Sequence, residues 1–417
     1  MSKRKPIKTP GLAQWERILL GYSSLLIFFA WDSGFNMQVM LPVTLLLFFG
    51  YITKTNGGFA DSKAVRLMLA ILGSAALSML SCLVLSPEAI SSTTIVRFFY
   101  FATILVYFVV ATDRSYNQTD VRFIISGNIV CGVIIALVVL LRYVAGATGK
   151  VTVVSVWGVD IEENYTAALL AFDCILAILA FVRTKEIHFR LILLVAFLII
   201  VFGIAYTGSR AALLSTFLSL GVMLLGLVFA SGVDGVFLRL PATLAVLAVL
   251  LLFLVPGALD SLPAWYVDRF FNNSYIDGSN IERIQLWLNG LSGFLERPLF
   301  GYGIGNFAYF TRTVFFSMQG YGVVVAHNTY IDTLVDLGLV GFALVFIFIF
   351  RKLNFCVALR SFEFVSLAIV MVATSFIVGG ERAFFFWNAL VVLSMLSQVR
   401  RPEEIHESLD LAGRANG

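Results

Sequence analysis

The sequence has 417 residues, of which 59% are hydrophobic and 13% charged, and its mean hydropathy is +0.93. Soluble domains carry about a quarter of charged residues, so this composition excludes a water-soluble globular protein. The net charge of +4 is small and forms no basic patch, which argues against nucleic acid as a partner. Runs such as "LILLVAFLIIVFGIA" (191–205) are apolar on every side, unlike barrel strands. We therefore predict an all-α polytopic protein in a lipid bilayer.

Apolar segments recur along the whole chain and predict about twelve transmembrane spans. We expect these spans at 18–31, 35–52, 66–86, 95–111, 122–145, 165–182, 188–206, 210–230, 240–259, 328–350, 362–379 and 383–399. The first segment is short and the last two are closely joined, so eleven or thirteen spans are alternatives. The expected domains are a tail (1–17), spans one to nine (18–259), a long polar loop (260–327), spans ten to twelve (328–399) and a second tail (400–417).

The basic residues predict the orientation of these spans. An even number of spans places both termini on one side of the membrane, and most of the 29 Lys and Arg residues fall on that side. The positive-inside rule identifies it as the cytoplasm. We therefore expect cytoplasmic termini and a loop at 260–327 on the outer face. The basic N-terminal segment is followed by no small-residue cleavage site, so we interpret it as a retained cytoplasmic tail.

The loop at 260–327 is much longer than the other connections, and loops of that length usually carry function. Apolar residues repeat in it at helical spacing, and Ser279 with Glu282 fits a capping box. We predict an amphipathic helix over 280–296, lying on the outer face of the membrane or over a cavity. The glycines of "RPLFGYGIGNF" (297–307) follow no strand, so they indicate a bend or close packing rather than a nucleotide site.

Two arginines on the expected outer side are candidates for binding an anion. Arg210 follows Ser209, a plausible N-cap, in "AYTGSRAALL" (205–214) and so begins a helix. An arginine is disfavoured at this positive end of the helix dipole unless an anion binds there. Arg283 lies one helical turn before Trp287 and could stack on its indole. The alternatives are a snorkelling arginine at 210 and a solvated helix face at 283.

His327, in "VVVAHNTYIDTLVDLGLVGF" (323–342), is one of only three histidines in the chain. It stands where the polar loop meets the tenth span, and Asn328 is a candidate N-cap for that span. The helix dipole disfavours a charged histidine at this position, and a neutral imidazole is what a general base requires. The alternative is an interfacial histidine held by a backbone carbonyl.

Asp173 is an acid in the middle of the sixth expected span, where acids are costly and often functional. It could be the proton site of a transporter or a structural partner of a polar group on another span. The loop has no DxD, HExxH or His/Cys cluster, so we expect neither a metal nor a cofactor. No nucleophile signature of the GxSxG kind is present.

Three motifs follow one another in the second half of the chain. His327-Asn328, nine residues and then Gly338-Leu339-Val340-Gly341 resembles the H[NSQ]-x9-GxxG signature of the O-antigen ligase and polymerase superfamily. "YTGSRAALL" (206–214) resembles the GSR segment of this superfamily. "ERIQLWLNGLSGFLERPLFGYGIGNF" (282–307) resembles its R-x3-W…P-L-x-G-x-G-x-x-N-F segment. The motifs cover roughly 205–342, whereas the N-terminal half is similar in topology only.

This resemblance implies a metal-independent, membrane-embedded glycosyltransferase of the GT-C type in the bacterial inner membrane. Such enzymes transfer a glycan from undecaprenyl pyrophosphate to an acceptor hydroxyl at the periplasmic face. In that comparison Arg210 and Arg283 would hold the pyrophosphate, and His327 would be the base. Further substrate-binding residues implied around them are Tyr206, Ser209, Trp287, Asn328 and Tyr330. Spans rich in phenylalanine, of which the chain has 39, could line a groove for the lipid.

The resemblance leaves open which acceptor is used. We favour a polymerase for O-antigen or exopolysaccharide, which joins lipid-linked repeats and could act with a chain-length regulator. The alternative is a ligase, which moves the glycan onto lipid A-core sugar. A transporter of polysaccharide or lipid-linked sugar is the competing class, and only Asp173 favours it because we find no internal repeat.

Overall fold

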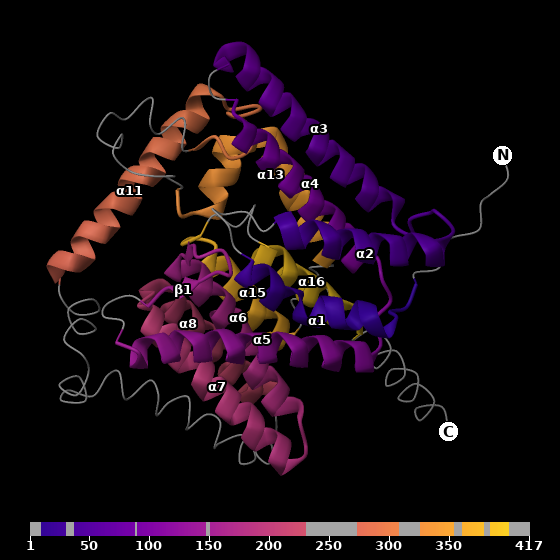
Figure 1. The fold of residues 1–417 in the computed structure, drawn as a ribbon, viewed down its shortest axis with the longest axis vertical. Coiled ribbons are helices and arrows are strands. Elements are labelled where there is room, and N and C mark those ends of the chain that lie inside the picture. The colour runs from indigo at the N-terminus through magenta and orange to yellow at the C-terminus, as the bar shows by residue number, and fades with distance from the viewer. Residues whose placement is uncertain are drawn as a thin grey trace.

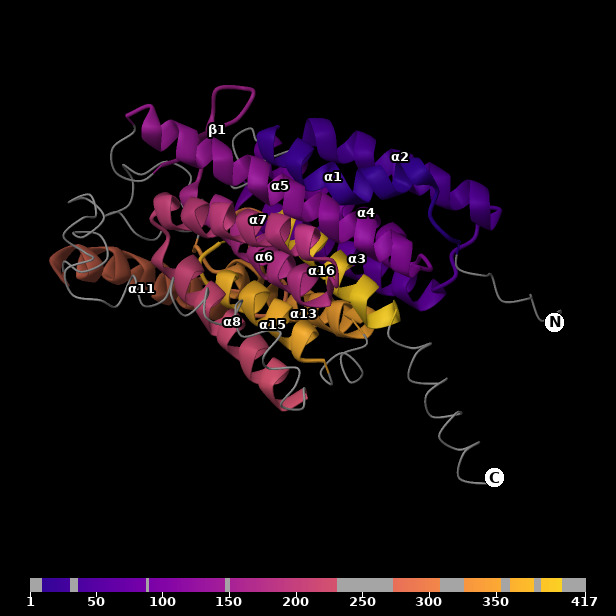
Figure 2. The same cartoon turned by 90° about the horizontal axis from the view of Figure 1, so that it is seen from below.

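The computed structural model describes residues 10–30, 37–87, 90–146, 151–230, 273–307, 326–353, 361–378 and 384–399, and the structural statements below concern these residues. They form a bundle of helices and one very short hairpin (Figures 1 and 2). The elements are α1 (Gln14–Phe29), α2 (Met37–Thr55), α3 (Ser62–Leu85), α4 (Ser92–Thr112), α5 (Gln118–Val144), β1 (Val153–Val154), β2 (Asp160–Ile161), α6 (Glu163–Arg183), α7 (Ile187–Thr207), α8 (Arg210–Ala230), α11 (Asn273–Glu296), α13 (Thr329–Leu353), α15 (Phe362–Thr374) and α16 (Phe384–Val399).

Seven of the described helices, α2 to α7 and α13, are long and apolar enough to cross a membrane. These helices agree with the predicted class of all-α polytopic membrane protein, whereas the number of twelve spans stays a prediction. The ninth expected span, at 240–259, lies outside the described residues, as does the loop segment at 308–325. The short antiparallel hairpin, in which Val153 pairs with Ile161, was not predicted.

The amphipathic helix of the loop is present but begins earlier than predicted. It starts at Asn273 rather than at residue 280, so Ser279 lies inside α11. The proposed capping box with Glu282 was therefore wrong, because a serine followed by an acid at this spacing also occurs within helices. The helix lies at the edge of the bundle and packs on α13, whereas α6 lies in the interior (Figures 1 and 2).

Small residues allow the interior helices to approach closely, as is common in membrane proteins. A Cβ atom on Gly127 of α5 would lie 2.7 Å from the carbonyl oxygen of Gly21 in α1. A Cβ atom on Gly203 of α7 would lie 2.6 Å from that of Ala136 in α5. These close contacts place α1 and α7 against α5, on which α6 also packs.

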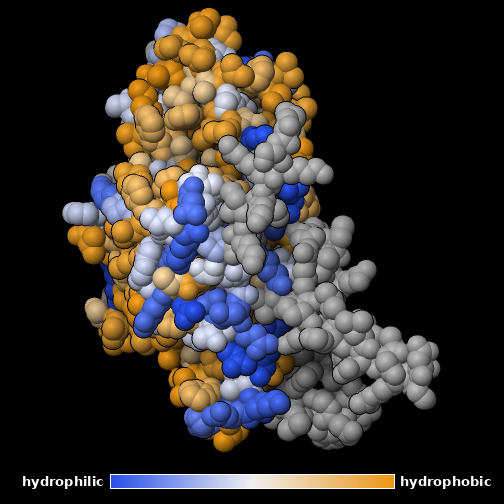
Figure 3. All heavy atoms as spheres, turned by 90° about the vertical axis from the view of Figure 1, so that its right-hand side faces the viewer, coloured by the Kyte–Doolittle hydropathy of each residue, from blue (hydrophilic) through white to orange (hydrophobic). Residues whose placement is uncertain are grey.

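One end of the bundle is held by ion pairs. Arg114 is paired with Glu16 at 2.8 Å, Arg183 with Glu363 at 2.7 Å, and Arg351 with Asp61 at 3.1 Å. These three arginines belong to the basic residues expected in the cytoplasm. Figure 3 views this end, where hydrophilic side chains gather beside broad hydrophobic surfaces. The helices α6 and α13 finish here, so both begin at the opposite end of the bundle.

The glycine-rich segment after α11 fits into a break in α13. Gly338 has φ 64° and ψ −173°, so the helix is interrupted there. The carbonyl of Val335 accepts the amide of Tyr302 at 2.8 Å, and the amide of Leu339 donates to Pro298 at 2.8 Å. The segment thus satisfies backbone groups that the break would otherwise leave without partners. The glycines therefore serve close backbone packing, as the sequence indicated.

Substituting Gly338→Ala tests this packing. Its Cβ atom would lie 2.4 Å from the carbonyl carbon of Leu299, at a positive φ that alanine adopts at a cost. We expect a loss of stability of about 2–4 kcal/mol, measured as a lower thermal unfolding temperature in detergent. The matched control is Gly73→Ala in α3, where a Cβ atom meets nothing within 4 Å. If both variants unfold at the wild-type temperature, this account of the break is wrong.

Candidate active site

Arg210, Arg283 and His327 come from three separate elements and lie at the end of the bundle where α6 and α13 begin. Arg210 is the first residue of α8, Arg283 lies in α11, and His327 lies two residues before the start of α13. Arg283 is close enough to the other two for electrostatic interaction: the charge of Arg210 acts on it, and its own charge acts on His327. The structure therefore brings these three residues into one neighbourhood.

The guanidinium group of Arg283 is in an unfavourable environment. Burial is the largest cause of a lowered pKa for Arg283, and the positive charge of Arg210 lowers it further. Glu162 and Glu163 act in the opposite direction without cancelling the effect. Within the described part of the chain, neither Arg210 nor Arg283 forms an ion pair. An anion that contacted both would relieve their mutual repulsion.

His327 contacts an acid that the sequence analysis did not identify. Its Nδ1 atom lies 3.2 Å from Oε1 of Glu162, and both side chains are a little over one quarter exposed. Burial alone would lower the pKa of His327, but the carboxylates of Glu162 and Asp332 outweigh burial and the charge of Arg283, so this pKa is raised. The expectation from the helix dipole alone, which favoured a neutral imidazole, therefore had the wrong direction.

Glu162 is itself held by a chain of hydrogen bonds. Burial alone would raise the pKa of Glu162. This pKa is nevertheless lowered, most by His327 and then by the hydrogen bond from Asn164 and the charge of Arg283. The Nδ2 atom of Asn164 donates to Oε1 of Glu162 at 2.8 Å. The hydroxyl of Ser209 in turn donates to Oδ1 of Asn164 at 2.9 Å. Ser209 thus precedes α8 as predicted, and its hydroxyl links the turn before Arg210 to the acid that contacts His327.

The backbone around His327 is fixed on both sides. His327 has φ 49°, which is uncommon for a residue other than glycine. The preceding residue, Ala326, donates its amide to Asp332 at 3.0 Å and accepts the indole N–H of Trp287 at 3.0 Å. Asn328 accepts the amides of the second and third residues that follow it, at 3.0 and 3.2 Å. The prediction that Asn328 caps the helix is confirmed.

Three predicted neighbours of the site have other contacts. Trp287 donates its indole N–H to the Ala326 carbonyl, and among the described residues it has no stacking contact with Arg283, which is the alternative that the sequence left open. Tyr206 packs on Tyr143 with ring centroids 4.2 Å apart. The hydroxyl of Tyr330 donates to Val372 at 3.3 Å, which directs this ring towards α15.

Asp173 lies elsewhere in the molecule. It is 2% exposed and packs against Gly132 of α5, and its Oδ2 atom has no hydrogen-bond partner among the residues that the structure describes. Ten residues of α6 separate it from Glu163, which is a rise of about 15 Å along the helix. Asp173 is therefore a buried residue of the bundle interior and not part of the site.

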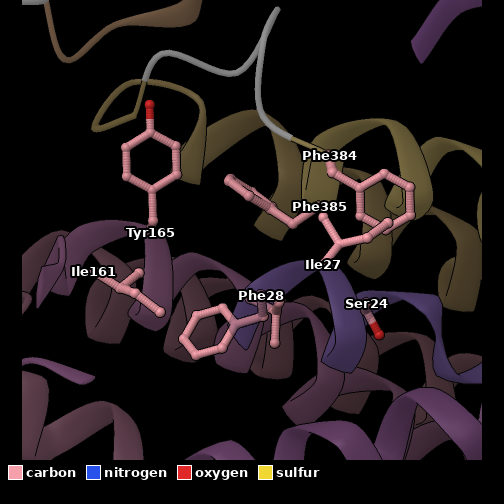
Figure 4. Close-up of a pocket in the computed structure, with 8 residues that line it drawn as sticks. Ser24, Ile27, Phe28, Ile161, Tyr165, Phe384 and Phe385 are labelled. Carbon is pink, nitrogen blue, oxygen red and sulfur yellow. The ribbon is translucent and has the colours of Figure 1, made fainter. Parts of the chain in front are cut away.

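A small apolar pocket lies beside the start of α6 (Figure 4). Its lining residues come from α1, β2, α6 and α16, and they are Ser24, Ile27, Phe28, Ile161, Tyr165, Leu169, Phe384 and Phe385. Ile161 directly precedes Glu162, and Tyr165 lies one helical turn after it. Three of the lining residues are phenylalanines, and the expected groove for the lipid stays a prediction.

The cap at Asn328 can be tested by substitution. Asn328→Ala removes the acceptor of the amides of Tyr330 and Ile331, and it should cost about 1 kcal/mol of stability. Asn328→Ser keeps a capping oxygen and should cost much less. Thermal unfolding of the two purified variants in detergent measures the difference. Equal unfolding temperatures would show that the side chain of residue 328 does not cap α13.

Comparison with known proteins places these residues in a family. Residues 195–347 match a family model described as O-antigen ligase. No curated protein matches the chain significantly. The matched range contains Arg210, Arg283, His327 and the glycine-rich segment, and it excludes Glu162 and the helices before α7. The match shows that residues 195–347 are similar to the O-antigen ligase family, and it supports the resemblance to the O-antigen ligase and polymerase superfamily.

Proposed function

We propose that this protein is a GT-C-type membrane glycosyltransferase that transfers a glycan from undecaprenyl pyrophosphate to an acceptor hydroxyl. The proposed role is that of an O-antigen or exopolysaccharide polymerase. The observation that carries the proposal is the convergence of Arg210, Arg283 and His327 within the segment that matches the O-antigen ligase family model. Contacts run from Ser209 through Asn164 and Glu162 to His327, and the indole of Trp287 in α11 binds the backbone before His327.

The two arginines suit the diphosphate of the donor. Guanidinium groups bind phosphate oxygens through paired, charge-assisted hydrogen bonds. The first turn of α8 begins at Arg210, so its free backbone amides add further donors for an anion. When the glycosidic bond to the diphosphate breaks, its electron pair passes to a diphosphate oxygen. Positive groups held in place before the reaction stabilise that growing charge.

His327 is positioned to accept the proton of the acceptor. Its Nδ1 atom faces Glu162, which leaves Nε2 as the nitrogen that can meet an acceptor hydroxyl. In the proposed step, Nε2 takes the hydroxyl proton while the hydroxyl oxygen bonds to the anomeric carbon of the donor sugar. The diphosphate leaves from that carbon with the electron pair of the broken bond. A base of this kind contributes typically ~10²–10⁴-fold.

A lipid-linked donor also has to place its isoprenoid chain. We place the diphosphate at the arginines and the isoprenoid chain in the adjoining bilayer. The ion-paired end of the bundle carries arginines expected in the cytoplasm, which supports a periplasmic site with both termini on the cytoplasmic face of the inner membrane.

The acceptor separates a polymerase from a ligase. A polymerase uses the sugar of another lipid-linked repeat, and a chain-length regulator would then be a partner. A ligase uses a lipid A-core sugar and performs the same chemistry. Glycans from cells that carry His327→Ala as their only copy distinguish the two. Single repeats capped on core would support the polymerase, whereas long unlinked chains on the lipid carrier would support the ligase.

Replacing each of the three residues by alanine should reduce transfer. We expect a loss of about 10²–10⁴-fold for His327→Ala and at least about tenfold for Arg210→Ala or Arg283→Ala. The assay follows glycan transfer from an isoprenoid-linked donor in membrane vesicles. The control is Arg190→Ala in α7, an arginine whose Nε binds the Thr184 carbonyl near its own turn. Wild-type transfer by all three site variants would overturn the proposal.

The charge of His327 also predicts a pH dependence. A base must be neutral, and the pKa of His327 lies above the ordinary value of about 6.5 because of Glu162 and Asp332. The transfer rate should therefore rise as the pH rises through that raised pKa and then level off. The initial transfer rate is measured between pH 5 and 9, a range of roughly two units on either side of neutrality. A profile that falls across this range would exclude His327 as the base.

A further inference from the structure

We propose that Glu162 is a positioning residue for His327, holding the imidazole with Nε2 towards the acceptor. This inference rests on the proposed function and adds a residue that lies outside the matched O-antigen ligase segment. The Asn164 amide and the Ser209 hydroxyl complete the arrangement, because they tie Glu162 to the turn that presents Arg210. The diphosphate site and the base would thus be aligned by one connected set of side chains.

The contacts of Glu162 are those of a carboxylate that orients an imidazole. Its Oε1 atom accepts the Asn164 amide at 2.8 Å and lies 3.2 Å from Nδ1 of His327, within ion-pair distance. A carboxylate at Nδ1 favours the tautomer that carries its proton there and leaves Nε2 free to act as the base. It also stabilises the imidazolium that forms when Nε2 takes a proton.

Rigid surroundings keep both partners in place. Asn164 is 6% exposed and Ser209 is 2% exposed, so the hydrogen bonds that hold Glu162 are shielded from water. On the other side, the Ala326 backbone is held by Asp332 and Trp287 directly before His327. The contact between Glu162 and His327 therefore joins the start of α6 to the start of α13.

Several charges act on His327, so the effect of Glu162 has to be separated from theirs. Asp332 of α13 favours the protonated imidazole, and Arg283 of α11 disfavours it. Arg210 of α8 and Glu163 of α6 act on Arg283. Replacing the Glu162 carboxylate by the similarly shaped amide of glutamine changes one of these contributions and keeps the others.

The charge of His327 can be measured without any transfer reaction. Diethyl pyrocarbonate modifies the neutral imidazole, and the chain has only two other histidines, His188 and His406. In a background with glutamine at these two positions, the pH dependence of modification reports His327 alone. We expect Glu162→Gln to move the midpoint of this curve to lower pH and Glu162→Asp to leave it closer to the parent. An unchanged midpoint in Glu162→Gln would overturn the proposal.

Transfer assays then test whether Glu162 acts through His327. Glu162→Gln should reduce the transfer rate roughly 10- to 100-fold, the range seen for carboxylates behind metal-bound histidines, and should move the acidic limb of the pH profile to lower pH. In a His327→Ala background the same change should add no further loss. A further loss there would show that Glu162 acts independently and would contradict the positioning role.

Asn164→Ala separates the position of Glu162 from its charge. This variant keeps the carboxylate but removes its hydrogen bond with residue 164. The transfer rate should therefore fall several-fold, whereas the midpoint of the modification curve should not move to lower pH. It also tests the proposal if Glu162→Gln fails to fold, since an unchanged rate in Asn164→Ala would contradict it.

Matched controls keep the inference separate from the proposed function. Glu186→Gln alters a second Glu–His contact of 3.2 Å, which is exposed and precedes α7, and should leave transfer unchanged. Ser215→Ala removes a hydroxyl that bonds only within α8, at 2.6 Å to Ala211, and should also leave it unchanged. If His327→Ala transfers at the wild-type rate, the proposed function fails. If His327→Ala is inactive while Glu162→Gln keeps the wild-type profile, only the role of Glu162 fails.

Discussion

The site depends on the repulsion between the like charges of Arg210 and Arg283, and burial of Arg283 makes its own charge still less favourable. The repulsion persists because the arginines belong to different helices, α8 and α11, whose positions are set by packing elsewhere. Such an arrangement is unfavourable for the free protein and favourable for a complex with a dianion or trianion. The nearby acids Glu162 and Glu163 reduce the repulsion without removing it.

Contacts elsewhere in the fold fix the positions of the helices that carry this site. At the opposite end, ion pairs such as Arg183 with Glu363 connect the finish of one helix to the start of another. Near the site, the break in α13 at Gly338 accepts the glycine-rich segment that follows α11. This packing ties α11, and with it Arg283, to the helix that His327 precedes. The glycines of the motifs are thus explained by backbone packing, whereas the roles of the histidine and the arginines are those that we propose.

The features that the sequence predicted correctly are local ones. Apolar runs predict helices because burial in a bilayer requires them, and Asn328 was recognised as a cap because its partners are its own neighbours. The start of α11 was misplaced because a capping pattern at Ser279 is equally compatible with a helix interior. The motif resemblance selected Arg210, Arg283 and His327, which the structure brings together, although composition and spacing alone left other interpretations open for each.

The features that the sequence could not predict are tertiary ones. Glu162 was missed although it begins a polar group, with Glu163 and Asn164, at the outer end of an expected span. Its partner, His327, lies far along the chain, and no local pattern connects them. The same contact explains why the helix dipole gave the wrong direction for the charge of His327. Trp287 was paired with Arg283 on helical spacing, whereas its indole binds the Ala326 backbone of another segment.

Binding of an isoprenyl pyrophosphate to the purified protein tests the central claim most directly. Calorimetry in detergent compares the wild type with Arg210→Ala and Arg283→Ala, and an isoprenyl alcohol without the diphosphate serves as the reference ligand. If the two arginines hold the diphosphate together, each variant should bind it about 10- to 100-fold more weakly, and binding of the alcohol should not change. Wild-type affinity for the pyrophosphate in both variants would contradict the account.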